Sequence, residues 1–186
     1  GVVAFRADPT AGVSGVFAGD ARAITSIADT SGRFAAFQGL PVINADGTVM
    51  FRADLKDGSK GIFTGRGGAL TTIAETGGQF GDFASFPSMN NEGTVAFCAT
   101  LTAGGAGIFT AQGGRLTTVV EAQGGFASFR TALINHTGAI VFAGTPHGGT
   151  LGIYAGPDPV GDRVFGLWDS LYGSTVTDFA LNPVSV

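Results

Sequence analysis

Cysteine and histidine, on which many metal and catalytic sites depend, are nearly absent from this sequence. One cysteine, Cys98, and two histidines stand in 186 residues, which excludes an intrachain disulfide and leaves too few ligands for a His/Cys metal site. The patterns G-x-x-x-x-G-K-[ST] and G-x-S-x-G are also missing. We therefore predict no metal, no cofactor and no enzymatic activity, and we interpret Cys98 as a buried apolar residue.

Charge is scarce as well. Only 13% of the residues are charged, the formal net charge is −4, and lysine occurs twice. A nucleic-acid partner is not expected, because it would require clustered positive charge. Hydrophobic residues make up 44% of the chain, which excludes disorder, and the 32 glycines lack the every-third spacing of collagen. The length fits one domain with a buried core.

Two long uncharged runs, residues 93–114 and 131–157, have the length of membrane-spanning segments. Both are broken by glycine pairs and are rich in threonine or β-branched residues. We interpret them as strands and turns, and we predict no transmembrane segment. The opening residues, GVVAF, show no signal-peptide pattern.

An internal repeat fills the chain. The strings GVVAF, GTVMF, GTVAF and GAIVF begin at Gly1, Gly47, Gly93 and Gly138, and an asparagine stands three residues before each of the last three glycines. Fixed intervals of this kind are typical of repeat architectures. The repeat indicates a single domain of four units, at residues 1–46, 47–92, 93–137 and 138–186.

Three further blocks recur within the units. One comprises SGVFAG, KGIFTG, AGIFTA and LGIYAG, and a second comprises ITSIADT, LTTIAET, LTTVVEA and VFGLWDS. The third is glycine-rich and leads to an aromatic residue. Most of the 16 phenylalanines thus occupy a few fixed positions, which indicates that they form the core. Alternating apolar residues between asparagine and glycine turns predict short strands.

Four short strands in a repeat of about 46 residues are typical of a β-propeller blade. We therefore predict an all-β fold, a β-propeller of four blade-like repeats, with a β-solenoid as the alternative. In one blade we expect the strand that enters the asparagine turn, residues 83–90, to be innermost. Residues 94–101, 107–110 and 116–121 should follow in that order.

The string NNEGTVAF at residues 90–97, with NADGTVMF at 44–51 and NHTGAIVF at 135–142, is similar to the motif of the bacterial NxxGxxAF tandem-repeat proteins. The resemblance covers all four units. Proteins of that family are typically exported, and many carry a C-terminal surface-sorting anchor. The resemblance implies an extracellular or cell-surface location in a bacterium and implies no catalytic activity. We identify no sorting anchor in this sequence.

Both termini fall inside a unit. The first unit lacks its inner strand, and the segment from Phe179 to Val186 is an inner strand without a following blade. Because unpaired strand edges invite pairing, we expect this segment to pair with the strand from Val2 to Arg6. Pairing within one chain would close a ring, and pairing with a neighbouring copy would give a ring or a filament. Alternatively, the chain is a fragment of a longer array.

An acidic residue follows the outer strand in each unit, and these residues are candidates either for a cation-binding ring or for turn acceptors. We favour the second interpretation, because outer strands lie too far apart to share an ion and calcium needs closely spaced oxygen ligands. The four residues are Asp29, Glu75, Glu121 and Asp169.

The fourth unit departs most from the others. It inserts GPDPVGD and carries the only tryptophan, Trp168, with Asp169 and Tyr172 close behind. Aromatic side chains with a polar tip are favoured in contact surfaces, so Trp168, Asp169 and Tyr172 are our candidates for contact with a partner or a glycan. The alternative is that Trp168 fills the space taken in other units by Ala28, Ala74 and Val120.

These observations favour a non-enzymatic extracellular repeat scaffold that associates with copies of itself. The alternative is a propeller module that binds a carbohydrate or another ligand.

Overall fold

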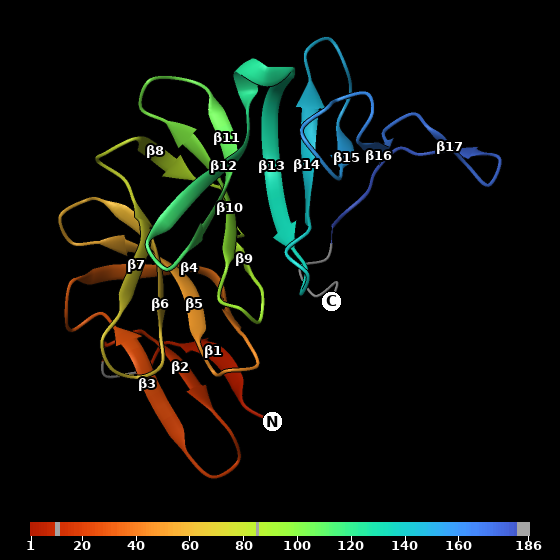
Figure 1. Ribbon diagram of the computed structural model, residues 1–186. Coiled ribbons are helices and arrows are strands. Elements are labelled where there is room, and N and C mark those ends of the chain that lie inside the picture. Colours follow the sequence, from red (N-terminus) through yellow and green to blue (C-terminus); the bar gives the residue numbers. More distant parts are fainter. Residues whose placement is uncertain (10–11, 85, 182–186) are drawn as a thin grey trace.

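The computed structural model of the protein describes residues 1–9, 12–84 and 86–181. Its regular structure consists of β-strands, apart from one short 3-10 turn, η1 (Ala122–Gly124) (Figure 1). The all-β prediction is confirmed. No helix among these residues is long and apolar enough to cross a membrane.

Four antiparallel sheets, S1 to S4, follow one another along the chain, and each contains its strands in sequence order. In Figure 1 they run from S1 at the bottom, through S2 and S3, to S4 on the right. S1 comprises β1 (Val3–Ala7), β2 (Gly15–Gly19) and β3 (Ile24–Asp29). S2 comprises β4 (Phe34–Ile43), β5 (Val49–Leu55), β6 (Lys60–Gly65) and β7 (Thr71–Glu75).

The other two sheets repeat this pattern. S3 comprises β8 (Phe80–Phe83), β9 (Ser88–Met89), β10 (Val95–Leu101), β11 (Ala106–Gln112) and β12 (Arg115–Glu121). S4 comprises β13 (Phe126–Ile134), β14 (Ile140–Pro146), β15 (Gly152–Tyr154) and β16 (Arg163–Gly166). A separate hairpin, β17 (Ser170–Leu171) and β18 (Ser174–Thr175), extends beyond S4.

The strand order predicted for one blade is confirmed in S3. β10 lies between β8 and β11, and β11 pairs with β12 on its other side. The innermost strand has two parts, since β8 and β9 pair with opposite ends of β10. In S2 the corresponding strand β4 is continuous, but its register against β5 shifts between Gln38 and Val42.

The repeated asparagine forms the tight turn between the first two strands of a sheet. Asn90 Oδ1 accepts hydrogen bonds from the backbone N–H groups of Glu92 (3.1 Å) and Thr94 (2.9 Å). Gly93, at φ 77°, donates its own N–H to the Asn90 carbonyl oxygen. A short amide side chain and a residue that accepts positive φ are both required, which explains the N-x-x-G spacing.

A second constraint joins a glycine to the aromatic residue two positions later. The Phe63 ring lies over Gly61, and a Cβ atom built at Gly61 would stand 2.5 Å from Phe63 Cζ and 3.1 Å from the Ala74 carbonyl oxygen. The same contact occurs between Gly107 and Phe109. The recurring G-x-[FY] string therefore reflects a close approach that leaves no room for a side chain.

The core lies between neighbouring sheets rather than within any one of them. Each of three buried clusters combines aliphatic residues of one sheet with the aromatic residues of the next; Val16 and Ile27 of S1, for example, belong to the cluster that holds Phe51 of S2. The aromatic sets are Phe34, Phe37, Phe51 and Phe63 in S2, Phe80, Phe83, Phe97 and Phe109 in S3, and Phe126, Phe129, Phe142 and Tyr154 in S4.

Polar contacts also join neighbouring sheets. Arg6 of S1 donates to the Phe37 carbonyl oxygen of S2 (2.7 Å), and Lys60 of S2 pairs with Asp82 of S3 (2.8 Å). Between S3 and S4, the Ile134 N–H donates to Ser88 Oγ (3.1 Å). These contacts help to fix how each sheet sits on the next.

Substitution of Gly61 by alanine should lower the free energy of unfolding by about 1–3 kcal/mol, the usual cost of overpacking a core. The added Cβ would collide with Phe63 and with the backbone of β7. Urea denaturation measures the effect. Gly68→Ala is the control, because a Cβ atom there has no heavy atom within 4 Å. Equal denaturation midpoints for the two variants would contradict this explanation of the G-x-[FY] string.

Candidate functional site

The hydrogen-bond register shows which acidic residues are equivalent. Asp29, Glu75 and Glu121 pair with the glycine of the G-x-[FY] string in the preceding strand, at Gly15, Gly61 and Gly107. In S4 the partner of Gly152 is Gly166. The predicted fourfold equivalence is therefore wrong for Asp169, which lies three residues further along. A local resemblance of short strings suggested the match, but strand pairing sets the register.

Asp29 and Glu75, two of the three equivalent carboxylates, have different local partners. Asp29 accepts a hydrogen bond from the Ser31 N–H (2.9 Å), and its bonds to the Ser31 hydroxyl and N–H lower the pKa of its carboxyl group. Glu75 pairs with Arg33 (2.6 Å). Asp29 is thus a turn acceptor, as predicted, whereas Glu75 joins the loop before β4 to β7. No group of three His, Cys, Asp or Glu side chains that could hold a metal occurs in the part of the chain that the structure describes.

Trp168 and Tyr172 lie at the hairpin β17–β18, which is an insertion. Asp29 and Phe34 are five positions apart, and the equivalent residues of the next two units keep this spacing. In the fourth unit Gly166 corresponds to Asp29 and Val176 to Phe34, and these two residues are ten positions apart. The extra residues form the hairpin. Its base is closed by hydrogen bonds from the Trp168 N–H to the Val176 carbonyl oxygen (2.8 Å) and from the Val176 N–H to the Asp169 carbonyl oxygen (2.9 Å).

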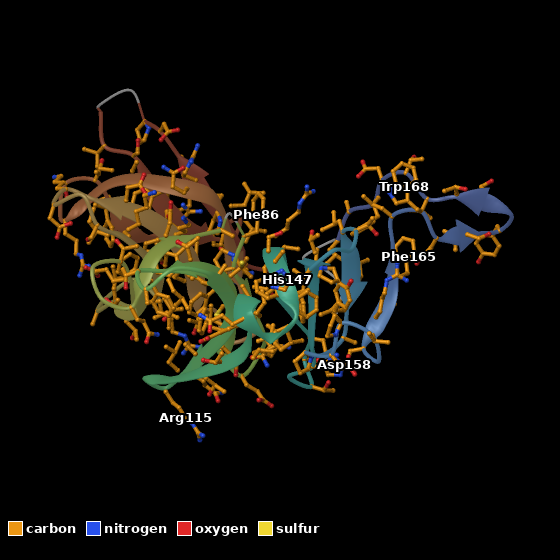
Figure 2. All side chains as sticks on the ribbon, turned by 90° about the horizontal axis from the view of Figure 1, so that it is seen from above. Phe86, Arg115, His147, Asp158, Phe165 and Trp168 are labelled. Atoms are coloured by element: carbon orange, nitrogen blue, oxygen red, sulfur yellow. The ribbon has the colours of Figure 1, made fainter. Side chains whose placement is uncertain are left out.

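Both aromatic side chains are presented to solvent. Trp168 is 64% exposed and Tyr172 is 100% exposed, and Figure 2 shows Trp168 beside the hairpin, away from Phe86. The alternative interpretation, that Trp168 fills the space taken by Ala28, is wrong, because the β15–β16 register places Phe165 there.

The backbone at these two aromatic residues is strained. Trp168 (φ 73°) and Tyr172 (φ 50°) are the only residues other than glycine with positive φ among those that the structure describes. Such conformations are costly for bulky side chains and are concentrated at functional sites. The strain marks this hairpin as a candidate contact surface.

Asp169 has a structural role at the base of the same hairpin. Its carboxylate accepts hydrogen bonds from Arg163 Nη2 (2.8 Å) and from the Gly166 N–H (2.8 Å). The bond from Arg163, and then the bond from Gly166, lowers the pKa of this carboxyl group. Asp169 therefore holds the chain where it leaves β16. It is next to Trp168 in the sequence, but its carboxylate oxygens bind Arg163 and Gly166.

Tyr154 is a feature that the sequence interpretation missed. It replaces phenylalanine at a repeat position, is fully buried, and its hydroxyl has no hydrogen-bond partner among the described residues. Burial raises the pKa of this phenol. The signal was visible in the string LGIYAG, where tyrosine stands in place of phenylalanine.

The open edge of S1 is the second candidate site. β1 pairs with β2, and no other described strand pairs with it. Residues 177–181 belong to no strand, although the Phe179 ring packs on Phe165 with centroids 5.3 Å apart. The predicted pairing of the segment from Phe179 to Val186 with the strand from Val2 to Arg6 is thus absent at residues 179–181. Residues 182–186 lie outside the described residues.

A shallow hollow of about 380 Å³ lies over the outer strand of S3. Its polar lining comes from Gln79, Thr102, Thr118 and Glu121, and its floor includes Phe109. The lining brings together hydroxyl, amide and carboxylate groups.

A family model for a family of unknown function (DUF7453) matches residues 18–153. The chain belongs to this family. The DUF7453 match runs from β2 to β15 and contains the whole of S2 and S3. Trp168, Asp169 and Tyr172 lie outside it. The comparison with curated proteins found no match.

The thiol of Cys98 should not react with a disulfide reagent in the native protein at pH 8. Cys98 is buried, as predicted, and burial raises the pKa of its thiol to about 12, so almost no thiolate forms at that pH. Spectrophotometric titration should detect one thiol per chain in denaturant. Rapid labelling of the native protein would contradict the burial.

Proposed function

We propose that this chain is a non-enzymatic extracellular repeat scaffold that associates with copies of itself into a ring or a filament. Its sheets act as the blades of a propeller-like assembly. Copies join by strand exchange, in which the segment from Phe179 to Val186 of one copy pairs with the strand from Val2 to Arg6 of another.

The observation that carries the proposal is a complementary pair of unpaired features. S1 has three strands and an open edge at β1, whereas S2 to S4 have a further strand at the equivalent edge. Residues 177–181 follow S4 at the place where each earlier sheet is followed by an inner strand, and they pair with no described strand. An exposed edge of this kind is a template for another strand.

The arrangement of the sheets supports the propeller-like part of the proposal. Each sheet is an antiparallel set of strands in chain order, and neighbouring sheets pack face to face through buried clusters. This is the construction of propeller blades, whereas the coils of a solenoid stack their strands along one axis. The extracellular, bacterial location rests on the resemblance to the NxxGxxAF repeat proteins.

The mass of the protein in solution should increase with concentration, as measured by size-exclusion chromatography with light scattering. Ala4→Pro should abolish this increase. Arg6 occupies the position in S1 that Cys98 has in S3. The Cys98 carbonyl oxygen accepts a hydrogen bond from the Ala84 N–H at the inner edge of S3. Because alternate residues of a strand face the same edge, Ala4 and Arg6 face the open edge of S1.

Ile24→Pro, on the opposite edge strand β3, is the control and should associate like the unmodified protein. Circular dichroism checks that both variants keep their strands. A protein that stays monomeric at millimolar concentration would refute the scaffold proposal.

Carbohydrate binding is the second candidate function, and the hairpin β17–β18 favours it. The inserted hairpin presents Trp168 and Tyr172 to solvent with strained backbones. Exposed aromatic faces of this kind can stack on the apolar face of a sugar ring.

A glycan array should therefore show binding that the double variant Trp168→Ala/Tyr172→Ala loses. Phe86→Ala is the matched control, because Phe86 is also half-exposed but lies away from the hairpin (Figure 2). A blank array with folded protein, or equal loss of binding in the control, would remove this candidate.

A further inference from the structure

The two end sheets expose faces that are buried at every internal junction. On S1 the Phe5 and Phe17 rings stack with centroids 5.7 Å apart but are only partly buried. Their equivalents in S2, Phe51 and Phe63, are 2% and 1% exposed. The difference arises because S2 has an inner strand and a preceding sheet over its aromatic face, whereas S1 has neither among the described residues.

S4 is incomplete on its opposite face. Ile153 and Phe165 are partly exposed there, whereas Ile62 and Ile108, which correspond to Ile153, are fully buried against the next sheet. Among the residues that the structure describes, no sheet covers this face of S4, just as none covers the aromatic face of S1.

The segment after S4 has the pattern of an inner strand. Val176 and Phe179 are three residues apart, as are Phe34 and Phe37 at the start of β4. The hairpin β17–β18 holds Val176 in place through two backbone hydrogen bonds, and Phe179 packs on Phe165. The segment thus lies on S4 in the position of the first element of a blade whose other three strands do not occur among the described residues.

We propose that a second copy of this chain supplies those three strands. S1 of the second copy packs on the exposed face of S4, with residues 176–181 of the first copy as its inner strand. Val176 and Phe179 then cover Phe5 and Phe17, and the junction has the same composition as the three internal cores. This inference rests on the proposed function and names the partner surface of the same site.

A second copy, rather than closure within one chain, follows from the placement of the two surfaces. Both are present in a single chain, yet the described residues of the segment pair with no strand of S1. S1 and S4 stand at the two ends of the arc that the four sheets form (Figure 1). A contact between unlike surfaces of two copies is heterologous and extends from copy to copy.

The internal junctions also predict the register. Gln38 of β4 stands opposite Arg52 of β5, and the corresponding residues at the new junction are Ala180 and Arg6. Cysteines at Ala180 of one copy and Arg6 of another should therefore form a disulfide. Cys98 does not interfere, because it is buried.

The experiment mixes the single variants Ala180→Cys and Arg6→Cys under mild oxidation and follows the products by non-reducing electrophoresis. We expect a disulfide-linked dimer from the mixture and a ladder of multimers from the double variant. Gln38→Cys/Arg52→Cys is the positive control for this geometry. Ala180→Cys with Ala7→Cys is the register control, because adjacent strand residues face opposite sides.

Two results would overturn the inference. An internally linked monomer from the double variant would show that the ring closes within one chain. Absence of the dimer, with the positive control oxidised, would show that the surfaces do not meet in this register. If the unmodified protein still gains mass with concentration, the scaffold proposal survives that failure; if it stays monomeric, both fail.

A core variant gives an independent measurement. Phe179→Ala should raise the concentration needed for association by about tenfold or more, as expected for a buried aromatic anchor at an interface. Phe86→Ala, which removes an aromatic ring outside the junction, should leave it unchanged. Equal effects of the two variants would count against Phe179 as part of the junction.

Discussion

Burial of apolar surface between neighbouring sheets is the interaction on which the rest of this structure depends. A sheet of three to five short strands has two faces, and both faces are apolar here, so no single sheet can be stable in water by itself. Each inner sheet contributes aliphatic residues to one junction and aromatic residues to the other. Stability is therefore a sum over neighbouring pairs, as in other repeat proteins.

This construction gives the end sheets a different status from the inner ones. An inner sheet has both faces covered, whereas Phe5 of S1 and Phe165 of S4 remain partly exposed. Since the two exposed faces have the composition of the two halves of an internal junction, the same burial that forms the core also favours association. Folding and assembly thus depend on one kind of contact, and the proposed scaffold function follows from that.

The fourth unit shows how far string similarity can be relied on. The apparent equivalence of Asp169 and Glu121 rested on a few matching letters, but the pairing of Gly152 with Gly166 moves the register by three residues. Hydrogen bonds between strands are long-range contacts. Gly152 and Gly166 are 14 positions apart, as are Gly107 and Glu121, so the predicted insertion of GPDPVGD is wrong and that string only replaces the loop of the other units. The extra length of the fourth unit lies at the hairpin β17–β18. Trp168 consequently lies outside the core, at a strained position that no repeat position predicts.

The sequence by itself determined the all-β fold, the four-part repeat, the turns at Asn44, Asn90 and Asn135, and the burial of Cys98 and of the repeated phenylalanines in S2 to S4. These follow from local spacing, because a tight turn or an apolar strand position needs particular residues at fixed intervals. Only the tertiary structure decided the register of β16, the exposure of Trp168 and the open faces of S1 and S4. Those depend on which segments meet across long sequence separations, and spacing within one unit carries no information about that.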